Sequence, residues 1–147
     1  MNLNLSQSFL QKLGTRVAVD LREHIQSGKD IDGRKFKAYV ASYRARKSAD
    51  GFKRQSSQQV NPPDLTLTGD MLRDLQVRGV SKNTVRIGWS GVFATRVARN
   101  EDRGRIISKK DKVFPKDIDV FIDNQFKLEL DRLTAKDNKT EIVNIRL

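Results

Sequence analysis

The segment from Val60 to Leu75 constrains the fold more than any other part of this sequence. Two consecutive prolines, at positions 62 and 63, favour an extended entry. Leu65 and Leu67 then alternate with polar residues, as in a short strand. Gly69 fits a turn where a side chain is disfavoured, and Thr68 or Asp70 is expected to cap a short helix directly after it. The apolar residues of that helix are Met71, Leu72 and Leu75.

A long amphipathic helix is predicted from Ser6 to Ser27. Its apolar residues recur every four positions and form one stripe: Phe9, Leu13, Val17, Leu21 and Ile25, with Leu10 and Ala18 beside them. Ser6 is suited to cap the start of the helix, and Gly28 is suited to close its end. His24 lies on the flank of the stripe and is expected to be a surface or packing residue.

The segment that follows the first helix is predicted to turn and then become helical. Residues 28–33 are rich in turn formers. Residues 34–47 predict a short helix, or a helical turn after an extended entry, because apolar residues recur at intervals of three and four. Phe36, Tyr39, Val40 and Tyr43 are expected to face inward. A polar loop at 48–63 follows.

The second half of the chain predicts an antiparallel hairpin between two helices. The strands are expected at Leu75–Val80 and Thr84–Trp89, with a turn at 81–83 and one wet face. The inward residues would be Val85, Ile87 and Trp89. A helix is expected at 91–100, a basic loop or frayed strand at 101–113, and a last helix from Phe114 and Pro115. Its buried stripe would be Ile118, Phe121, Ile122, Phe126, Leu130 and Leu133.

The C-terminal residues 140–147 are expected to form a strand or arm, with Val143, Ile145 and Leu147 on one face. These elements indicate an α+β fold in which a long N-terminal helix packs on a small antiparallel sheet. With 147 residues, the chain is expected to be a single domain, 1–147.

The positive charge of the chain is concentrated in two segments. The net charge is +11, from 29 Lys and Arg against 18 Asp and Glu. Eight basic residues against Asp50 give positions 34–54 a charge of +7, and six against Asp111 give positions 103–116 a charge of +5. Such a field favours polyanions or acidic protein neighbours. The candidate contact residues are Arg34, Lys35, Lys37, Arg44, Arg46, Lys47, Lys53, Arg54, Arg103, Arg105, Lys109, Lys110 and Lys112.

The composition argues against several classes of function. With no Cys, the chain has no disulfide, zinc ribbon or thiol nucleophile, and the single His24 has no base–nucleophile arrangement in the sequence. Asp117, Asp119 and Asp123 fit the positive end of a helix dipole better than a metal site. Asp30 and Asp32 fit turn positions better than a calcium loop. We therefore expect no enzyme activity, no cofactor and no metal, and a soluble protein made in the cytoplasm.

Two phrases of the sequence stand on either side of the polar loop. The first, DG..F..Y...Y...K, runs from Asp32 to Lys47, and the second, L..TG.ML..L, runs from Leu65 to Leu75. Together they resemble the tail-completion and virion-morphogenesis proteins of tailed bacteriophages. The residues that carry the resemblance are Asp32, Gly33, Phe36, Tyr39, Tyr43, Leu65, Leu67, Thr68, Gly69, Met71 and Leu72. The resemblance covers roughly residues 5–100, and the last third of the chain does not match.

The resemblance implies a structural virion protein of the phage neck or upper tail. Such a subunit forms a homo-oligomeric ring, six- or twelve-fold, between the portal and the tail tube, and it transforms no substrate. Its neighbours would be connector or portal-side proteins and tail-tube or terminator proteins, with non-specific contact to the genomic DNA and none to a membrane. A tail terminator or another connector ring protein is an alternative. A non-specific nucleic-acid-binding module is an alternative from a different class.

Overall fold

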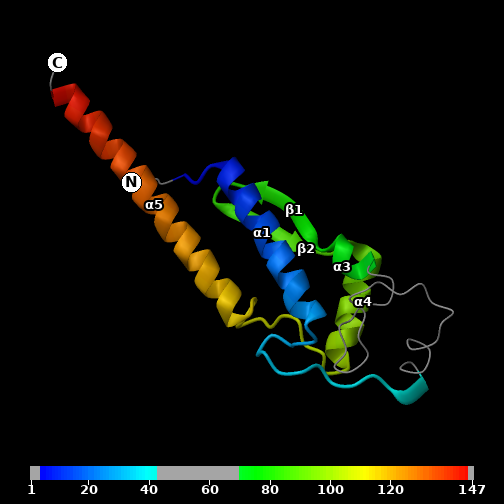
Figure 1. The fold of residues 1–147 in the computed structure, drawn as a ribbon. Helices are drawn as coiled ribbons and strands as arrows, with labels where there is room; N and C mark the ends of the chain where they lie inside the picture. Colours follow the sequence, from blue (N-terminus) through cyan, green and yellow to red (C-terminus); the bar gives the residue numbers. More distant parts are fainter. Residues whose placement is uncertain (1–3, 43–69, 146–147) are drawn as a thin grey trace. The chain divides into compact units, whose positions relative to one another are not determined.

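The computed structural model describes residues 4–42 and 70–145 (Figure 1). Its helices and strands are α1 (Gln7–Gln26), α3 (Asp70–Asp74), β1 (Gln76–Ser81), β2 (Thr84–Gly88), α4 (Gly91–Asp102) and α5 (Lys116–Ile145). They divide into two compact units, residues 1–115 and 116–147, at a position where the sequence shows no boundary. The predicted loop at 48–63, the strand at 65–67 and the turn at Gly69 lie outside the described residues.

Helix α1 begins and ends where the sequence predicts. The Ser6 hydroxyl accepts a hydrogen bond from the Phe9 amide at 3.1 Å, and Gly28 adopts a φ of +78°, which closes the helix at little steric cost. His24 is a half-buried packing residue, whose Nε2 donates to the Asp30 carbonyl at 2.7 Å. Phe9 of the predicted stripe is half-buried. The other residues of the stripe are buried: Leu10, Leu13, Val17, Ala18, Leu21 and Ile25.

The predicted hairpin is confirmed to within two residues at each end. Strands β1 and β2 pair antiparallel around a two-residue turn in which Asn83 has a φ of +55°. A bulge between Val77 and Gly79 places an extra residue in β1. Because of the bulge, Val77 pairs with Ile87 and Val80 pairs with Val85, so these four half-buried residues share one face although Val77 and Val80 are three positions apart.

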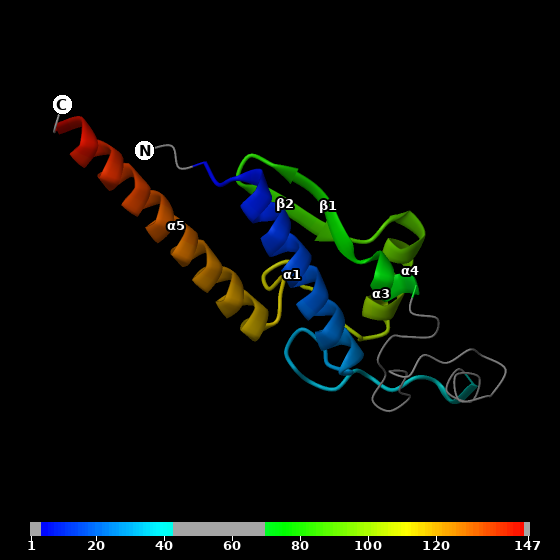
Figure 2. The same ribbon diagram turned by 45° about the horizontal axis from the view of Figure 1, so that its top comes forward.

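Helix α1 lies along the hairpin in both views (Figures 1 and 2). The close approach is at Gly14, which is buried in the middle of the helix. A Cβ atom built there would lie 2.6 Å from Val85 Cγ2 and 2.9 Å from Val77 Cγ2. Only a residue without a side chain allows the helix backbone to reach the valines at this distance. This α1–hairpin layer confirms the predicted α+β architecture.

Three polar anchors hold α3 between α1, the hairpin and α4. Arg22 of α1 donates to the Leu75 carbonyl, and Trp89 Nε1 donates to the Met71 carbonyl at 2.8 Å. Asp74 accepts from the Ser90 amide at 2.6 Å, and this hydrogen bond is the largest of the causes that lower the pKa of Asp74. The expected roles of Met71 and Leu72 in the core are confirmed, since both are buried.

Helix α4 is confirmed but buries less than expected. It runs two residues beyond the predicted end at Asn100, and Val97 is its buried residue, whereas Val92 is 68% exposed. Its N-cap residue, Ser90, is the residue whose amide and hydroxyl are bonded to Asp74.

Helix α5 corrects the prediction for the C-terminal residues. It begins directly after Pro115, with Asp117 and Asp119 in its first turn, and continues as one helix to Ile145. The expected strand or arm at 140–147 is therefore wrong for residues 140–145. No Gly or Pro interrupts the sequence between residues 116 and 147, so the helix has no local reason to stop.

The predicted buried stripe of α5 is only partly buried. Leu130, which belongs to the stripe, is 38% exposed. Val120 and Leu128, which lie outside the stripe, are 50% and 62% exposed. Within the helix, Arg132 forms a bidentate pair with Glu129, at 2.7 Å for each of two hydrogen bonds. This pair lowers the pKa of Glu129 below its usual value. The rest of the stripe is Ile118, which is buried, and Phe121, Ile122, Phe126 and Leu133, which are half-buried.

Candidate functional site

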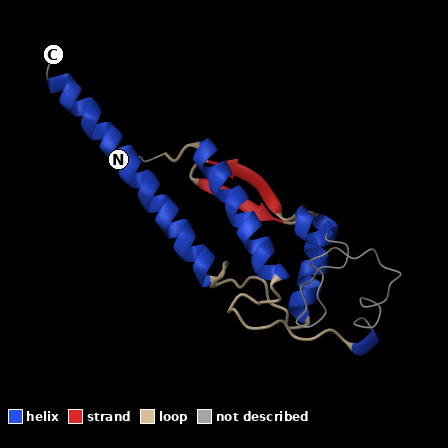
Figure 3. Ribbon diagram, in the orientation of Figure 1, coloured by secondary structure: helices blue, strands red, loops and turns tan. Residues whose placement is uncertain are grey.

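Two loops rich in basic residues lie side by side at the C-terminal end of α1. We call residues 28–38 the first basic loop and residues 103–112 the second basic loop; both are among the tan segments in Figure 3. The Ile31 amide donates to the Ile106 carbonyl at 2.9 Å, which joins the two loops directly. Ile31 and Ile107 are almost fully buried, at 1% and 2% exposure, so the joint is packed as well as hydrogen-bonded.

The first basic loop is a tight turn organised by Asp30. Its carboxylate Oδ1 accepts from the amides of Asp32 and Arg34, at 2.9 and 2.8 Å. Gly33 follows with a φ of +78°, a conformation that other residues rarely adopt. Lys29 and Lys35 then pair across the turn as an antiparallel bridge. The predicted turn at 28–33 is confirmed.

The chain after this turn is irregular, not helical. Residues 36–40 have no regular secondary structure, and Ala41 and Ser42 are helical, so a helix that includes residues 36–40 is wrong. Phe36 and Tyr39 are buried, at 4% and 9% exposure. Val40 was expected to face inward, but it is 69% exposed, because the irregular segment does not follow the helical period. Tyr43 lies outside the described residues.

Arg105 joins the two loops from the inside. Its side chain is buried, and its guanidinium donates to the carbonyls of Lys37 and Ala38 at 2.9 and 3.0 Å, and to Asn100 Oδ1 at 3.2 Å. The same group stacks over the Tyr39 ring, 4.7 Å from its centroid. The planar fork of Arg suits several oxygen acceptors at once. This predicted contact residue is therefore internal to the fold.

Asp32 ties the second loop to the first through two lysines. Lys109 Nζ lies 2.5 Å from Asp32 Oδ2, and Lys112 Nζ lies 3.0 Å from Oδ1. The hydrogen bond from Lys109, followed by that from Lys112, lowers the pKa of Asp32 from 3.8 to about 2. Two further predicted contact residues thus have an internal counter-ion.

The Asp32 cluster predicts a specific acid sensitivity. A carboxylate with a lowered pKa stabilises the fold above about pH 4, and this stabilisation is lost as the pH falls from about 4 towards 2. We expect the melting temperature of the wild type to fall more steeply over this range than that of Asp32→Asn, which cannot titrate there. Thermal melts followed by circular dichroism at a series of pH values test this. Parallel curves for the two proteins would contradict the assigned ion pairs.

Six basic side chains of the two loops are exposed and take part in no ion pair of the described structure. They are Lys29, Arg34, Lys35, Lys37, Arg103 and Lys110. Five of them were predicted contact residues. Lys29 was missed because the charge count began at Arg34, although Lys29 is only five positions earlier. Arg44, Arg46, Lys47, Lys53 and Arg54 lie outside the described residues.

Metal-binding clusters and membrane-spanning helices are both absent from the described residues. Among residues 4–42 and 70–145, no group of three or more His, Asp or Glu side chains is placed to hold a metal ion. In the part of the chain that the structure describes, none of the helices combines the length and the apolar character needed to cross a membrane. Comparisons with protein-family models, with curated proteins and with solved structures find no match.

Proposed function

We propose that this chain is a structural subunit of the neck of a tailed bacteriophage, a tail-completion protein that forms a ring between the portal side and the tail tube. The sequence phrases from Asp32 to Lys47 and from Leu65 to Leu75 support this proposal by their resemblance to such proteins. A tail terminator or another connector ring protein would belong to the same class of structural subunit.

The observation that carries the proposal is the role of the first phrase in the structure. Asp32 binds Lys109 and Lys112, and Gly33 supplies a turn that needs a positive φ. Phe36 is buried, and Tyr39 lies beneath the Arg105 guanidinium. Each of these four residues maintains the shape of the chain, as expected if the phrase specifies an assembling subunit rather than a catalyst.

The second phrase supports the same interpretation. Met71, Leu72 and Leu75 are all buried, and Trp89 and Arg22 bind the carbonyls of Met71 and Leu75. The described residues of both phrases thus form the framework between α1, the hairpin and the basic loops. In the proposed ring, this framework would maintain the shape of each of six or twelve copies, with connector and tail proteins on either side.

Head–tail joining in vitro tests the proposal. Filled heads and free tails, prepared from phage lacking this chain, are expected to join when the purified protein is added and to stay separate without it. Infectious titre and electron microscopy of the mixture give the two readouts. Heads and tails that join equally well in the absence of the chain would remove the proposal.

A further inference from the structure

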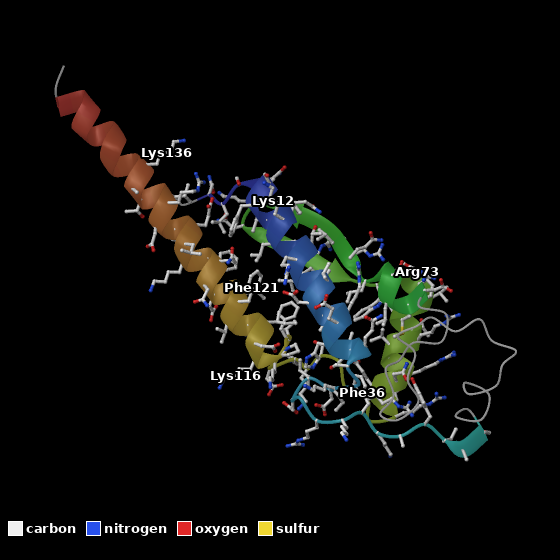
Figure 4. All side chains as sticks on the ribbon, in the orientation of Figure 1. Lys12, Phe36, Arg73, Lys116, Phe121 and Lys136 are labelled. Atoms are coloured by element: carbon white, nitrogen blue, oxygen red, sulfur yellow. The ribbon has the colours of Figure 1, made fainter. Side chains whose placement is uncertain are left out.

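Three lysines of the first basic loop are exposed close to one another. Lys29 and Lys35 are directly opposite each other in an antiparallel bridge, so their side chains lie on one side of it. Lys37 lies two residues beyond Lys35 and is also exposed. Phe36, between them, points into the core beside the C-terminal end of α1 (Figure 4).

The second basic loop lies against Lys37. Gly104 is close to the Lys37 side chain, since a Cβ atom built on Gly104 would be 3.6 Å from Lys37 Cδ. Arg103, the residue before Gly104, is exposed beside this contact. Arg34 and Lys110 add two exposed cations at the turns of the two loops.

The backbone that carries these cations is held in place before any ligand binds. Arg105 holds the carbonyls of Lys37 and Ala38 from below, and Asp32 holds Lys109 and Lys112. In the described structure, Asp32 is the one carboxylate of the two loops that forms ion pairs. Lys109 and Lys112 already occupy it. Among the described residues, the six exposed cations have no such partner, and a backbone held in this way lowers the entropy cost of ordering the loops on a polyanion.

We propose that this surface, made of Lys29, Arg34, Lys35, Lys37, Arg103 and Lys110, binds the phosphates of double-stranded DNA without sequence preference. Binding to single strands without sequence preference generally uses exposed aromatic rings on which bases stack. Here Phe36 is buried, and the face of Tyr39 is covered by Arg105. The loops therefore offer charge for the backbone but no stacking surface in their described residues.

The same surface is poorly suited to an acidic protein partner. The cores of protein–protein interfaces are enriched in aromatic residues and depleted of Lys. In these loops the large apolar side chains, Ile31, Phe36 and Ile107, point into the fold, and lysine is the most frequent exposed residue. Contacts with phosphates need only accessible cations. Each such contact contributes about −0.9 to the slope of the logarithm of the binding constant against the logarithm of the salt concentration.

This inference assigns the expected DNA contact of the proposed neck subunit to particular residues, and it is tested separately from the proposed function. Binding of purified protein to DNA needs no heads or tails, so a failure to bind leaves the joining experiment unaffected, and a failure to join leaves the binding result standing.

The test compares a short mixed-sequence duplex with one of its own single strands by fluorescence anisotropy, over a salt series from about 50 to 200 mM. We expect the wild type to bind the duplex at least as tightly as the single strand. The variant Lys35→Glu/Lys37→Glu is expected to lose at least about tenfold in duplex affinity, and its salt slope is expected to fall by about 2.

A matched control removes the same amount of positive charge elsewhere. Lys12 and Lys82 are exposed and lie towards the other end of α1, where the Leu5 amide binds the Asn83 side chain (Figure 4). Lys12→Glu/Lys82→Glu is expected to keep the wild-type salt slope and most of its affinity. Thermal melts of both variants show whether they are folded.

Four results would overturn the inference. Equal losses in the two double variants would mean that net charge alone drives binding. Tighter binding of the single strand would mean that bases are contacted. Polyglutamate that displaces the duplex at matched charge concentration would point to an acidic protein partner. An absence of duplex binding at the lowest salt would exclude a DNA surface.

Discussion

Replacing Gly14 by alanine is expected to lower the free energy of unfolding by about 1–2 kcal/mol. In an ordinary helix the same change is stabilising by roughly 0.5–1 kcal/mol, because glycine loses more backbone entropy on folding. At Gly14 the new Cβ would lie 2.6 Å from Val85 Cγ2 and 2.9 Å from Val77 Cγ2. Carbon atoms normally approach to about 3.5–4.0 Å, so α1 must move away from the hairpin, and overpacking of this kind costs about 1–3 kcal/mol. The clash therefore outweighs the helix propensity.

Three further variants isolate the clash at Gly14. Gly91 is the first residue of α4 and has no atom within 4 Å of a built Cβ, so Gly91→Ala is expected to be neutral or stabilising. Val85→Ala removes the nearer methyl group, so the double variant Gly14→Ala/Val85→Ala should be more stable than the sum of the single changes predicts, by about 1 kcal/mol. Urea unfolding of the four proteins measures this. Additive effects would show that α1 and β2 do not meet at these atoms.

The elements of this fold that the sequence predicted well are those with strong local signals. The four-residue period between Phe9 and Ile25, with Ser6 before it and Gly28 after it, locates α1 to within one residue. The alternation of Val85, Ile87 and Trp89 across a short polar turn locates the hairpin. Both patterns repeat at the period of the structure they form, so no information from distant residues is needed.

Long-range contacts were not predictable in the same way. Gly14 interrupts an apolar stripe, which indicates a close approach, but the sequence does not say that Val77 and Val85 are the partners. The bulge at Arg78 changes which residues of β1 face α1, and its one local signal, Gly79 within the strand, was not used in the prediction. At residues 140–145 a local pattern was misleading. The alternation of Val143 and Ile145 suggested a strand, but these residues continue helix α5.

The candidate site was predicted in outline and not in detail. Counting charges located both basic loops, since charge density is a property of the sequence alone. The count did not distinguish exposed cations from those with internal roles. Lys109 and Lys112 bind Asp32, which is 77 positions or more away in the chain, and Arg105 binds Lys37 across 68 positions. These pairings depend on the tertiary fold, in which Ile31 and Ile106 bring the loops together.

Arg105→Lys is expected to lower the free energy of unfolding by about 2–4 kcal/mol, although it preserves the charge. A hydrogen bond from a charged donor contributes about 1.5–3 kcal/mol, and a buried carbonyl left without its donor adds a desolvation cost. The guanidinium of Arg105 binds the Lys37 and Ala38 carbonyls and Asn100 Oδ1 while stacking on Tyr39. A lysine ammonium is a point charge on a flexible stem and cannot reproduce this planar arrangement. The expected loss follows from geometry, not from charge.

Arg103→Lys provides the matched control, since Arg103 is exposed and only two residues away. This change is expected to alter the free energy of unfolding by less than about 0.5 kcal/mol, as is usual for exposed positions. Amide hydrogen exchange adds a local measurement, because the Ile31 amide is bonded to the Ile106 carbonyl and the Phe36 amide to the Gly28 carbonyl. In Arg105→Lys these two amides should exchange faster relative to those of α1. If Arg105 contributed only a positive charge to the loops, both arginine variants would melt and exchange like the wild type.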